Sequence, residues 1–208
     1  AANASASDSV TYQNVNPTVS ISKSHTGTIN EGTTGQQLVY HFTVTNTSTA
    51  STDPVTVTTL SDTVLGDLLP AFTAANGGSA TLAYGASKSF DVTYTAPVAN
   101  AGAQINNTVS VAASDDDMGS TAANASASDS VTYQNVNPTI SISKSHTGTI
   151  NEGTSGQTLV YHFTVSNTST ASTDPVTVTA LSDTVLGNLL PAFTAANGGS
   201  ATLAYGAS

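Results

Sequence analysis

Apolar and polar residues alternate with a period of two along most of the chain. The clearest stretch is 37–46, where Leu38, Tyr40, Phe42 and Val44 share one face. Successive side chains of a strand point to opposite faces, so this alternation predicts a half-buried β-strand. The same period predicts strands at 18–23, 54–59, 80–84, 87–95 and 105–113, and a final strand that runs through Val131 and Tyr133.

The stretch 60–75 departs from this alternation. Apolar pairs at Val64-Leu65 and Leu68-Leu69 surround Gly66 and Pro70, and we expect one helical turn there. Glycine- and asparagine-rich turns separate the other segments. About seven short strands over about 120 residues, with no helical period, predict an all-β fold of the immunoglobulin-like β-sandwich type.

The chain repeats itself. Residues 122–208 match residues 1–87 at an offset of 121, with six mild differences. A unit of this length fits one domain per repeat. We therefore interpret the chain as a slice of a longer tandem array, with 1–16 as the last strand of a preceding repeat, 17–137 as a complete repeat and 138–208 as the first part of a following one.

Composition narrows the function classes. Three Lys and no Arg face thirteen acidic residues, giving a net charge of −10. This charge excludes a phosphate-binding surface for nucleic acid and argues against attraction to anionic lipid. There is no Cys, so no disulfide holds the fold. The polarity comes from Ser, Thr, Asn and Gly rather than from charged residues, which is typical of extracellular repeat proteins. The sequence contains no apolar run long enough to span a membrane, so we expect no membrane insertion in this segment.

A series of short motifs follows a fixed order along the chain. They are Val19-Ser-Ile-Ser-Lys23, Asn30-Glu31-Gly32, Tyr40-His-Phe-Thr-Val-Thr-Asn46, Asp53-Pro-Val-Thr-Val57, Leu60-Ser-Asp62, Tyr84-Gly-Ala-Ser87, Asn107-Thr-Val-Ser-Val111 and Ala113-Ser-Asp-Asp-Asp117. With these motifs the chain resembles the Ig-like repeats of the domain-of-unknown-function-eleven type, which build large bacterial and archaeal surface proteins, including adhesins. The resemblance implies a location at the cell surface or outside the cell.

Oxygen donors near the boundary between repeats suggest a calcium site. Ca²⁺ takes six to eight hard oxygen ligands, and three adjacent carboxylates repel one another without a cation. The alternative is a solvated acidic turn. Asp129, like its counterpart Asp8, falls on the apolar parity of its strand, for which we expect either a bulge or a metal ligand. The candidate ligands are Asp115, Asp116, Asp117, Asp129, Asn135, Asn137 and Glu152.

A covalent cross-link is a second candidate. Pilin-type Ig domains join a Lys of the first strand to a late-strand Asn, with a buried carboxylate as catalyst. Lys23 ends the first predicted strand, and Asn106 or Asn107 lies on a late one. The carboxylate candidates are Asp62, Asp91 and Glu31. The alternative is a Lys whose ammonium reaches into solvent at the strand end.

Histidine and asparagine are two further candidate residue types, for zinc binding and for glycosylation. The histidines His25, His41, His146 and His162 are not placed together by the sequence, so we expect surface His rather than a zinc site. Acceptor patterns for N-glycosylation occur at Asn3, Asn46, Asn106, Asn124 and Asn167.

No recognised catalytic motif occurs, and we expect no enzyme activity. The leading hypothesis is a structural repeat of an extracellular stalk, fibre or cell-surface layer, an adhesin-type spacer whose partners are the neighbouring repeats. One alternative is a glycan- or protein-binding module that uses its end loops, for instance 60–75. Another is a subunit of a self-assembling surface filament, in which strand edges pair between chains.

Overall fold

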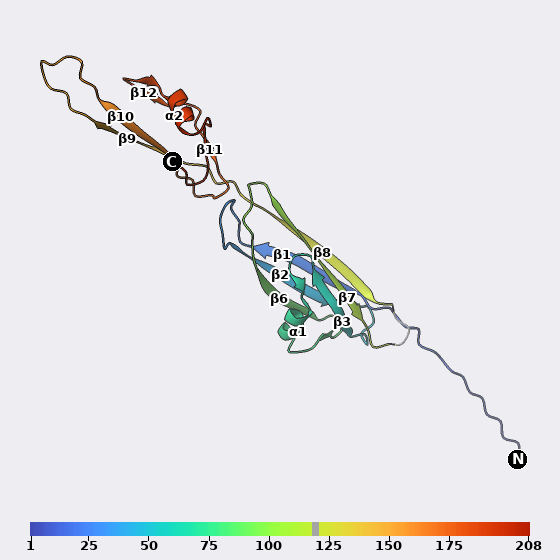
Figure 1. Cartoon of the computed structure of the whole chain (residues 1–208). Coiled ribbons are helices and arrows are strands. Elements are labelled where there is room, and N and C mark those ends of the chain that lie inside the picture. The colour runs from blue at the N-terminus through green and yellow to red at the C-terminus, as the bar shows by residue number, and fades with distance from the viewer. Residues whose placement is uncertain (118–120) are drawn as a thin grey trace. The chain divides into compact units, whose positions relative to one another are not determined.

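The computed structural model describes residues 1–117 and 121–208 and consists of antiparallel β-sheets with two short helices (Figure 1). The all-β prediction is thus confirmed. The chain divides into two compact units: Ala1–Gly27, Leu38–Tyr94 and Ile105–Ser130 form the first, and Thr28–Gln37, Thr95–Gln104 and Val131–Ser208 form the second. Two loops of the first repeat therefore belong to the same compact unit as the second repeat.

One sheet of the first repeat has three strands, β1 (Val19–Thr26), β2 (Gln37–Asn46) and β6 (Ser87–Thr95), in the order β1-β2-β6. The predicted alternation of β2 is confirmed, because its four apolar side chains from Leu38 to Val44 are at most 1% exposed. In the antiparallel register of β1 and β2, Lys23 lies opposite Phe42.

The other sheet has the order β4-β3-β7-β8, and β5 pairs with Val55 and Thr56 at the start of β3. Its strands are β3 (Val55–Asp62), β4 (Gly66–Asp67), β5 (Thr81–Leu82), β7 (Gln104–Ser114) and β8 (Ala123–Thr132). The register of β3 against β7 shifts between Val57 and Thr59. Because of this bulge, Leu60 and Asp62 point inward after Val55 and Val57. The predicted strand 54–59 ended too early because the bulge interrupts the period of two.

The expected helical turn is present as α1 (Leu69–Ala75), with Pro70 in its first turn. The side chain of Asp67 accepts a hydrogen bond from the Leu69 amide at 3.0 Å, just before the helix begins. Phe72 of α1 is fully buried. Its ring meets Phe90 edge-on at 6.2 Å, and Phe90 stacks on Phe42 at 5.1 Å, so the helix seals one side of the core.

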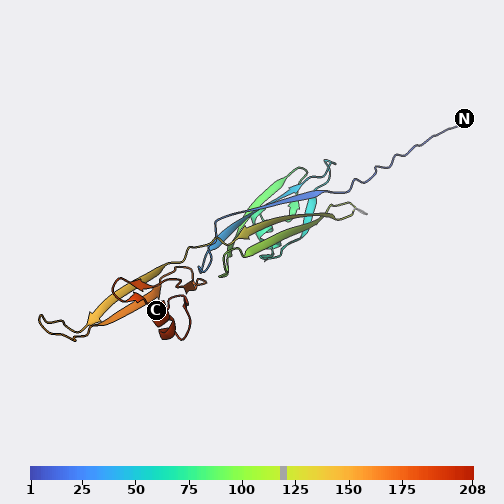
Figure 2. The same cartoon turned by 90° about the horizontal axis from the view of Figure 1, so that it is seen from above.

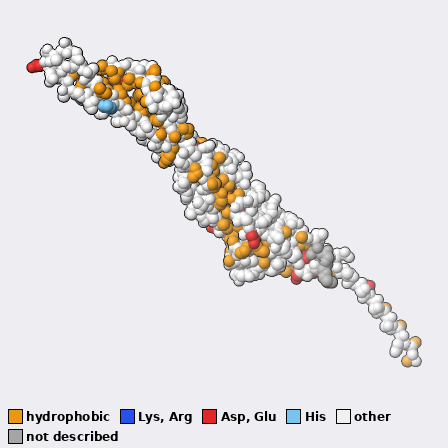
Figure 3. Space-filling model, in the orientation of Figure 1, with side chains coloured by type: hydrophobic (Ala, Val, Ile, Leu, Met, Phe, Trp, Pro, Cys, Tyr) orange, Lys and Arg blue, Asp and Glu red, His pale blue; other side chains and the backbone are white. Residues whose placement is uncertain are grey.

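The second unit repeats the early elements of the first. In the pairing of β9 with β10, Lys144 lies opposite Phe163, as Lys23 lies opposite Phe42. A small core of Val165, Val178 and Leu203 forms. Apolar side chains gather on the surface of this unit (Figure 3), and Ile140, Ile142 and Val160 are exposed. The elements are β9 (Ile140–Thr147), β10 (Val160–Asn167), β11 (Val176–Thr177), β12 (Ser182–Asp183), β13 (Gly187–Asn188), α2 (Leu190–Ala196) and β14 (Thr202–Leu203).

Residues 1–16 and 122–137 have identical sequences but different structures. The later copy contains β8, which pairs with β7, and its Val131 is 6% exposed. The earlier copy is an extended trace outside the sheets, in which Val10 is 84% exposed (Figure 2). The neighbouring strand, and not the intrinsic propensity of the sequence, decides whether this segment is a strand.

Candidate functional site

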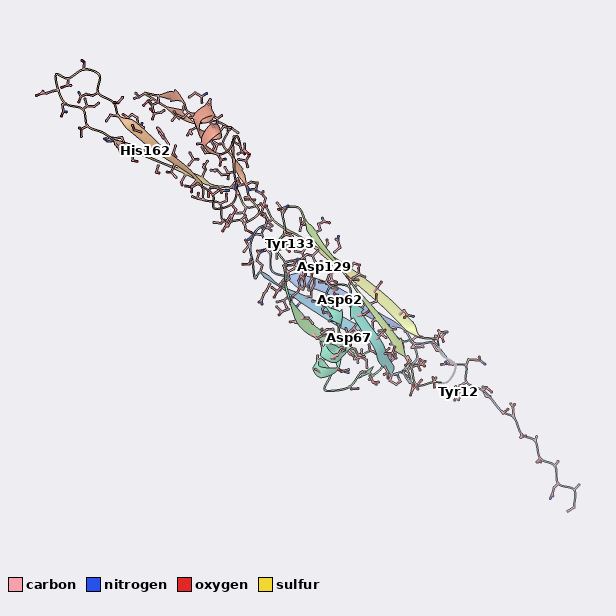
Figure 4. The ribbon with its side chains drawn as sticks, viewed as in Figure 1. Tyr12, Asp62, Asp67, Asp129, Tyr133 and His162 are labelled. Carbon is pink, nitrogen blue, oxygen red and sulfur yellow. The ribbon has the colours of Figure 1, made fainter. Side chains whose placement is uncertain are left out.

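Lys23 is buried between the two sheets of the first repeat. Its side chain is 0% exposed, and its Nζ donates a hydrogen bond of 2.5 Å to Oδ2 of Asp62, whose side chain is also 0% exposed. Asp62 is the last residue of β3 (Figure 4). The solvated lysine considered as an alternative is therefore wrong. The sequence held a signal for this burial, since Lys23 shares the inward parity of Val19 and Ile21.

Aromatic rings complete the surroundings of this ammonium. Nζ lies 4.8 Å from the ring centroid of Tyr40 and 5.5 Å from that of Phe42. Burial lowers the pKa of Lys23, although the hydrogen bond and charge of Asp62 oppose the shift. The other carboxylate oxygen of Asp62 accepts the amide hydrogens of Val64 and Leu65 at 2.9 and 2.8 Å. These bonds hold the Asp62 carboxylate in one orientation. Because the pKa of Lys23 is lowered, its amine becomes neutral at a pH closer to the physiological range.

Asn107 of β7 lies beside this pair. It is 1% exposed, and its Oδ1 accepts a hydrogen bond of 3.1 Å from the hydroxyl of Thr63, the residue after Asp62. Burial raises the pKa of Tyr40 and the Asn107 side chain partly offsets the shift, so these two groups are neighbours. Nevertheless, neither the Tyr40 hydroxyl nor Asn107 Nδ2 has a hydrogen-bond partner among the described residues. A buried polar group left unpaired costs about 1–3 kcal/mol, so these two groups lower the stability of the folded state.

The structure distinguishes among the cross-link candidates. Asn106 points to the exposed face of β7, whereas Asn107 points inward. Asp91 pairs at the surface with His41 at 2.7 Å, and Glu31 belongs to the second unit. Of these candidates, the buried ones in the first unit are therefore Lys23, Asp62 and Asn107.

The second repeat provides a comparison. Lys144 donates a hydrogen bond to Asp183, as Lys23 does to Asp62, but its side chain is 39% exposed. The hydrogen bond from Lys144 lowers the pKa of Asp183 to about 2. The chain holds no residue equivalent to Asn107 in this repeat, because the repetition ends at the counterpart of Ser87.

A second candidate site lies in the second unit, where Glu31 is 5% exposed and accepts several hydrogen bonds. Its carboxylate accepts the amide hydrogens of Val136 at 2.9 Å and Ala101 at 3.1 Å, and the hydroxyl of Thr173 at 3.3 Å. These bonds, the one from Val136 above all, lower the pKa of Glu31.

Next to Glu31, Asp174 and Gly32 complete what we call the junction cluster, namely Glu31, Gly32, Val136, Ser172, Thr173 and Asp174. Burial raises the pKa of Asp174, and the neighbouring Glu31 raises it further. The carbonyl of Gly32 accepts two hydrogen bonds from Ser172, at 3.1 Å from its amide and 2.7 Å from its hydroxyl. The sequence gives no sign of these roles of Gly32 and Asp174, because their neighbours are about 140 residues away along the chain.

The calcium candidates fall in two groups. Asp115, Asp116 and Asp117 lie in the first unit, and burial together with the charges of the other two raises the pKa of Asp117. In the second unit, Asn135 donates to Asn137 at 3.2 Å, and Glu152 is exposed. Among residues 1–117 and 121–208, no group of three or more His, Asp and Glu is arranged to hold a metal ion. Calcium at these residues stays a prediction.

Asp129 has a protein partner. Its Oδ2 lies 2.5 Å from Nδ1 of His25, with both side chains partly buried. Burial alternates without interruption through β8, so His25, and not the expected bulge, accommodates the carboxylate. His25 thereby differs from the expected surface His, while His41 lies at the surface beside Asp91.

The glycosylation candidates differ in accessibility. Asn3, Asn106 and Asn124 are exposed. Asn46 is 1% exposed, and its Nδ2 donates to the carbonyls of Asp53, Leu82 and Ala83. Its counterpart Asn167 makes the equivalent three bonds. Attachment of a glycan at Asn46 or Asn167 requires these bonds to break.

No family model, curated protein or solved structure matches the chain. Among the described residues, no helix is long and apolar enough to cross a bilayer. The family resemblance therefore rests on the sequence motifs alone and stays a prediction.

Proposed function

We propose that the chain is part of an extracellular tandem array of immunoglobulin-like β-sandwich repeats, which serves as a stalk, fibre or cell-surface layer. The observation that carries this proposal is the repetition of structure along with sequence. The pairs β1–β2 and β9–β10 have the same register, and α1 and α2 follow them at the same spacing. Nearly identical units favour added length over a distinct activity for each unit.

The core of the first repeat supports the sandwich architecture. Two sheets contribute buried side chains, Tyr40 and Phe42 from one and Val57 and Val109 from the other. The Lys23–Asp62 bond joins β1 of the first sheet to β3 of the second. Antiparallel sheets packed in this way around one core are the basis of immunoglobulin-like domains.

The junction cluster supports the expectation that the joints are stiff. Pro138 restricts the preceding Asn137 to extended conformations. The carboxylate of Glu31 binds the Val136 amide, two residues before Pro138, and the Thr173 hydroxyl beyond it. A flexible Gly/Ser tether makes no such contacts, so we propose that each repeat is held against the next one.

Solution scattering on chains of one, two and three complete repeats tests the proposal. A spacer array predicts that the maximum dimension rises by an equal step with each added repeat. A dimension that does not rise regularly would contradict a stiff spacer. A glycan array with the same chains checks the binding-module alternative, and reproducible hits would count against a pure spacer. Sedimentation at increasing concentration checks the filament alternative, for which association is expected.

A further inference from the structure

We propose that Lys23 and Asn107 become joined by an amide bond inside the first unit, with Asp62 as the catalytic residue that transfers the protons. The bond would tie β1 of one sheet to β7 of the other. The three side chains are all buried, and the chain contains no disulfide that could provide such a tie. This inference does not depend on the proposed function, since it concerns chemistry within a single repeat.

The amine is positioned for this reaction. Lys23 Nζ has Asp62 Oδ2 as its hydrogen-bond partner and aromatic rings around it. A proton can therefore pass to the carboxylate within an existing hydrogen bond, and burial favours the neutral amine of Lys23. The neutral amine is the nucleophile that acylation requires.

The amide group is also prepared. Thr63 donates to Asn107 Oδ1, where negative charge develops when the carbonyl carbon is attacked. The amide nitrogen, Nδ2, has no hydrogen-bond partner among the described residues. It is the group that departs as ammonia, so the reaction removes the unpaired donor from the interior. Tyr40 lies next to both the Lys23 amine and the Asn107 side chain. Thr63, which follows Asp62 in the chain, donates a hydrogen bond to Asn107. The amine and the amide are therefore linked through the same neighbouring residues.

The steps balance without an outside reactant. The Lys23 ammonium gives one proton to Asp62, and the amine attacks the side-chain carbonyl carbon of Asn107. Asp62 passes its proton to the Asn107 nitrogen and takes one from the attacking nitrogen. The bond from carbon to the Asn107 nitrogen breaks and ammonia leaves, taking up the proton that Asp62 now holds. The products are an amide between Lys23 and Asn107, an ammonium ion and ionised Asp62.

Asn107 is a better acceptor than Asp62 itself. A direct amide between Lys23 and Asp62 would release water and would need the carboxylate to be activated. Both oxygens of Asp62 already accept hydrogen bonds, from Lys23 and from the Val64 and Leu65 amides, and these bonds favour the unreactive carboxylate. The two assignments differ in the mass that is lost, ammonia in one case and water in the other.

The intact mass of the purified full chain tests the proposal. We expect a mass lower than that of the sequence by one ammonia molecule in all or nearly all molecules. Digestion provides an independent check, because the chain has three lysines and no arginine. Trypsin should cut the denatured chain after Lys88 and Lys144 but not after modified Lys23, leaving residues 1–88 covalently joined to residues 89–144.

Variants locate the chemistry. Asn107→Ala and Asp62→Asn should both restore the full mass and release residues 24–88 as a separate tryptic peptide. Lys144→Met is the matched control and should keep the mass deficit, since its repeat has no counterpart of Asn107 within the chain. Circular dichroism of each variant shows whether it has folded, and the measurement on the unmodified sequence needs no variant at all.

Three results would overturn the proposal. The first is the full sequence mass, with cleavage after Lys23, in folded protein. The second is loss of one water with a link from Lys23 to Asp62. The third is a mass deficit that persists in Asn107→Ala.

Discussion

Gly32 and Ser172 approach each other so closely that no side chain fits between them. A Cβ atom built on Gly32 would lie 2.3 Å from the backbone nitrogen of Ser172, and the φ angle of Gly32 is +62°. Both the contact and the backbone conformation therefore require glycine. Its counterpart Gly153 has a φ angle of +71° but open space around its Cβ position.

Substitution of these two glycines by alanine therefore distinguishes the loss of the close contact from backbone strain alone. Gly32→Ala should break both hydrogen bonds from Ser172 and disturb the junction cluster, whereas Gly153→Ala should cause only the backbone strain. Amide hydrogen exchange at Ser172, measured by NMR in both variants, checks the prediction. Exchange at Ser172 should rise by at least about tenfold in Gly32→Ala, which corresponds to one hydrogen bond, and stay unchanged in Gly153→Ala. Equal effects of the two substitutions would show that the contact is not stabilising.

The buried Lys23–Asp62 pair predicts a large loss of stability when the lysine is removed. Lys23→Met leaves the Asp62 carboxylate buried without its partner, which costs about 3–5 kcal/mol, and it also removes the proposed bond to Asn107. The matched variant Lys144→Met alters a pair whose lysine is 39% exposed, and it should have a much smaller effect. Urea denaturation followed by tyrosine fluorescence measures both. A small effect of Lys23→Met would mean that water or rearrangement satisfies Asp62.

The pair of Glu31 and Asp174 predicts a specific pH dependence. The pKa of Glu31 is lowered from 4.5, so its contribution to stability is present above pH 4.5 and is lost as the pH falls through its folded-state pKa. The pKa of Asp174 is raised from 3.8, so stability falls as the pH rises above 3.8 through its folded-state pKa.

Asp174→Asn should therefore remove the loss of stability on the alkaline side and leave the acid-side loss from Glu31 in place. The Val136 and Ala101 amides donate to Glu31, so their hydrogen exchange measures the local stability of the junction cluster. The exchange rates are measured between pH 3 and 7 and corrected for the intrinsic rate. Asp53→Asn, the same substitution in the first unit, is the control and should not alter these amides. Parallel pH profiles for Asp174→Asn and the unmodified chain would contradict the coupling.

Calcium binding predicts a shift in the thermal unfolding of the first unit. A ligand that binds only the native state stabilises it by about 2.7 kcal/mol at 100 times its Kd. If Asp115, Asp116 and Asp117 hold Ca²⁺, excess Ca²⁺ should raise the Tm, EDTA should reverse the rise, and replacement of all three by Asn should abolish it. Glu152→Gln tests whether that exposed carboxylate belongs to the site. No response to Ca²⁺ in the unmodified chain would leave the acidic turn as solvated surface.

The strands were predictable because their signal is local. The alternation in β2 indicated its bounds and its inward face, and the apolar pairs around Gly66 and Pro70 indicated the short helix. The end of β3 was not predictable from alternation, since a bulge shifts its register and turns Asp62 inward. A bulge depends on the neighbouring strand, and the sequence of β3 alone does not identify that neighbour.

The chemistry was predictable only in part. Lys23, Asn107 and Asp62 were all among the candidates, but their convergence depends on how the two sheets pack. The junction cluster was missed because it joins segments that are distant along the chain. The parity of Asp129 predicted either a bulge or a metal ligand, whereas its partner is His25, 104 positions away. Sequence spacing does not reveal contacts of that range.

The identity of residues 1–16 with residues 122–137 has a consequence for folding. One side of β7 pairs with β3, and two segments of the same sequence can pair with its other side. The segment that forms β8 is tethered to β7 by a loop of fewer than ten residues, whereas the other is separated from it by almost ninety, a difference in loop-closure entropy of about 2 kcal/mol. Correct pairing thus depends on proximity along the chain. In an array of such repeats, each β7 pairs correctly only if the segment that follows it binds before an identical segment from another repeat does.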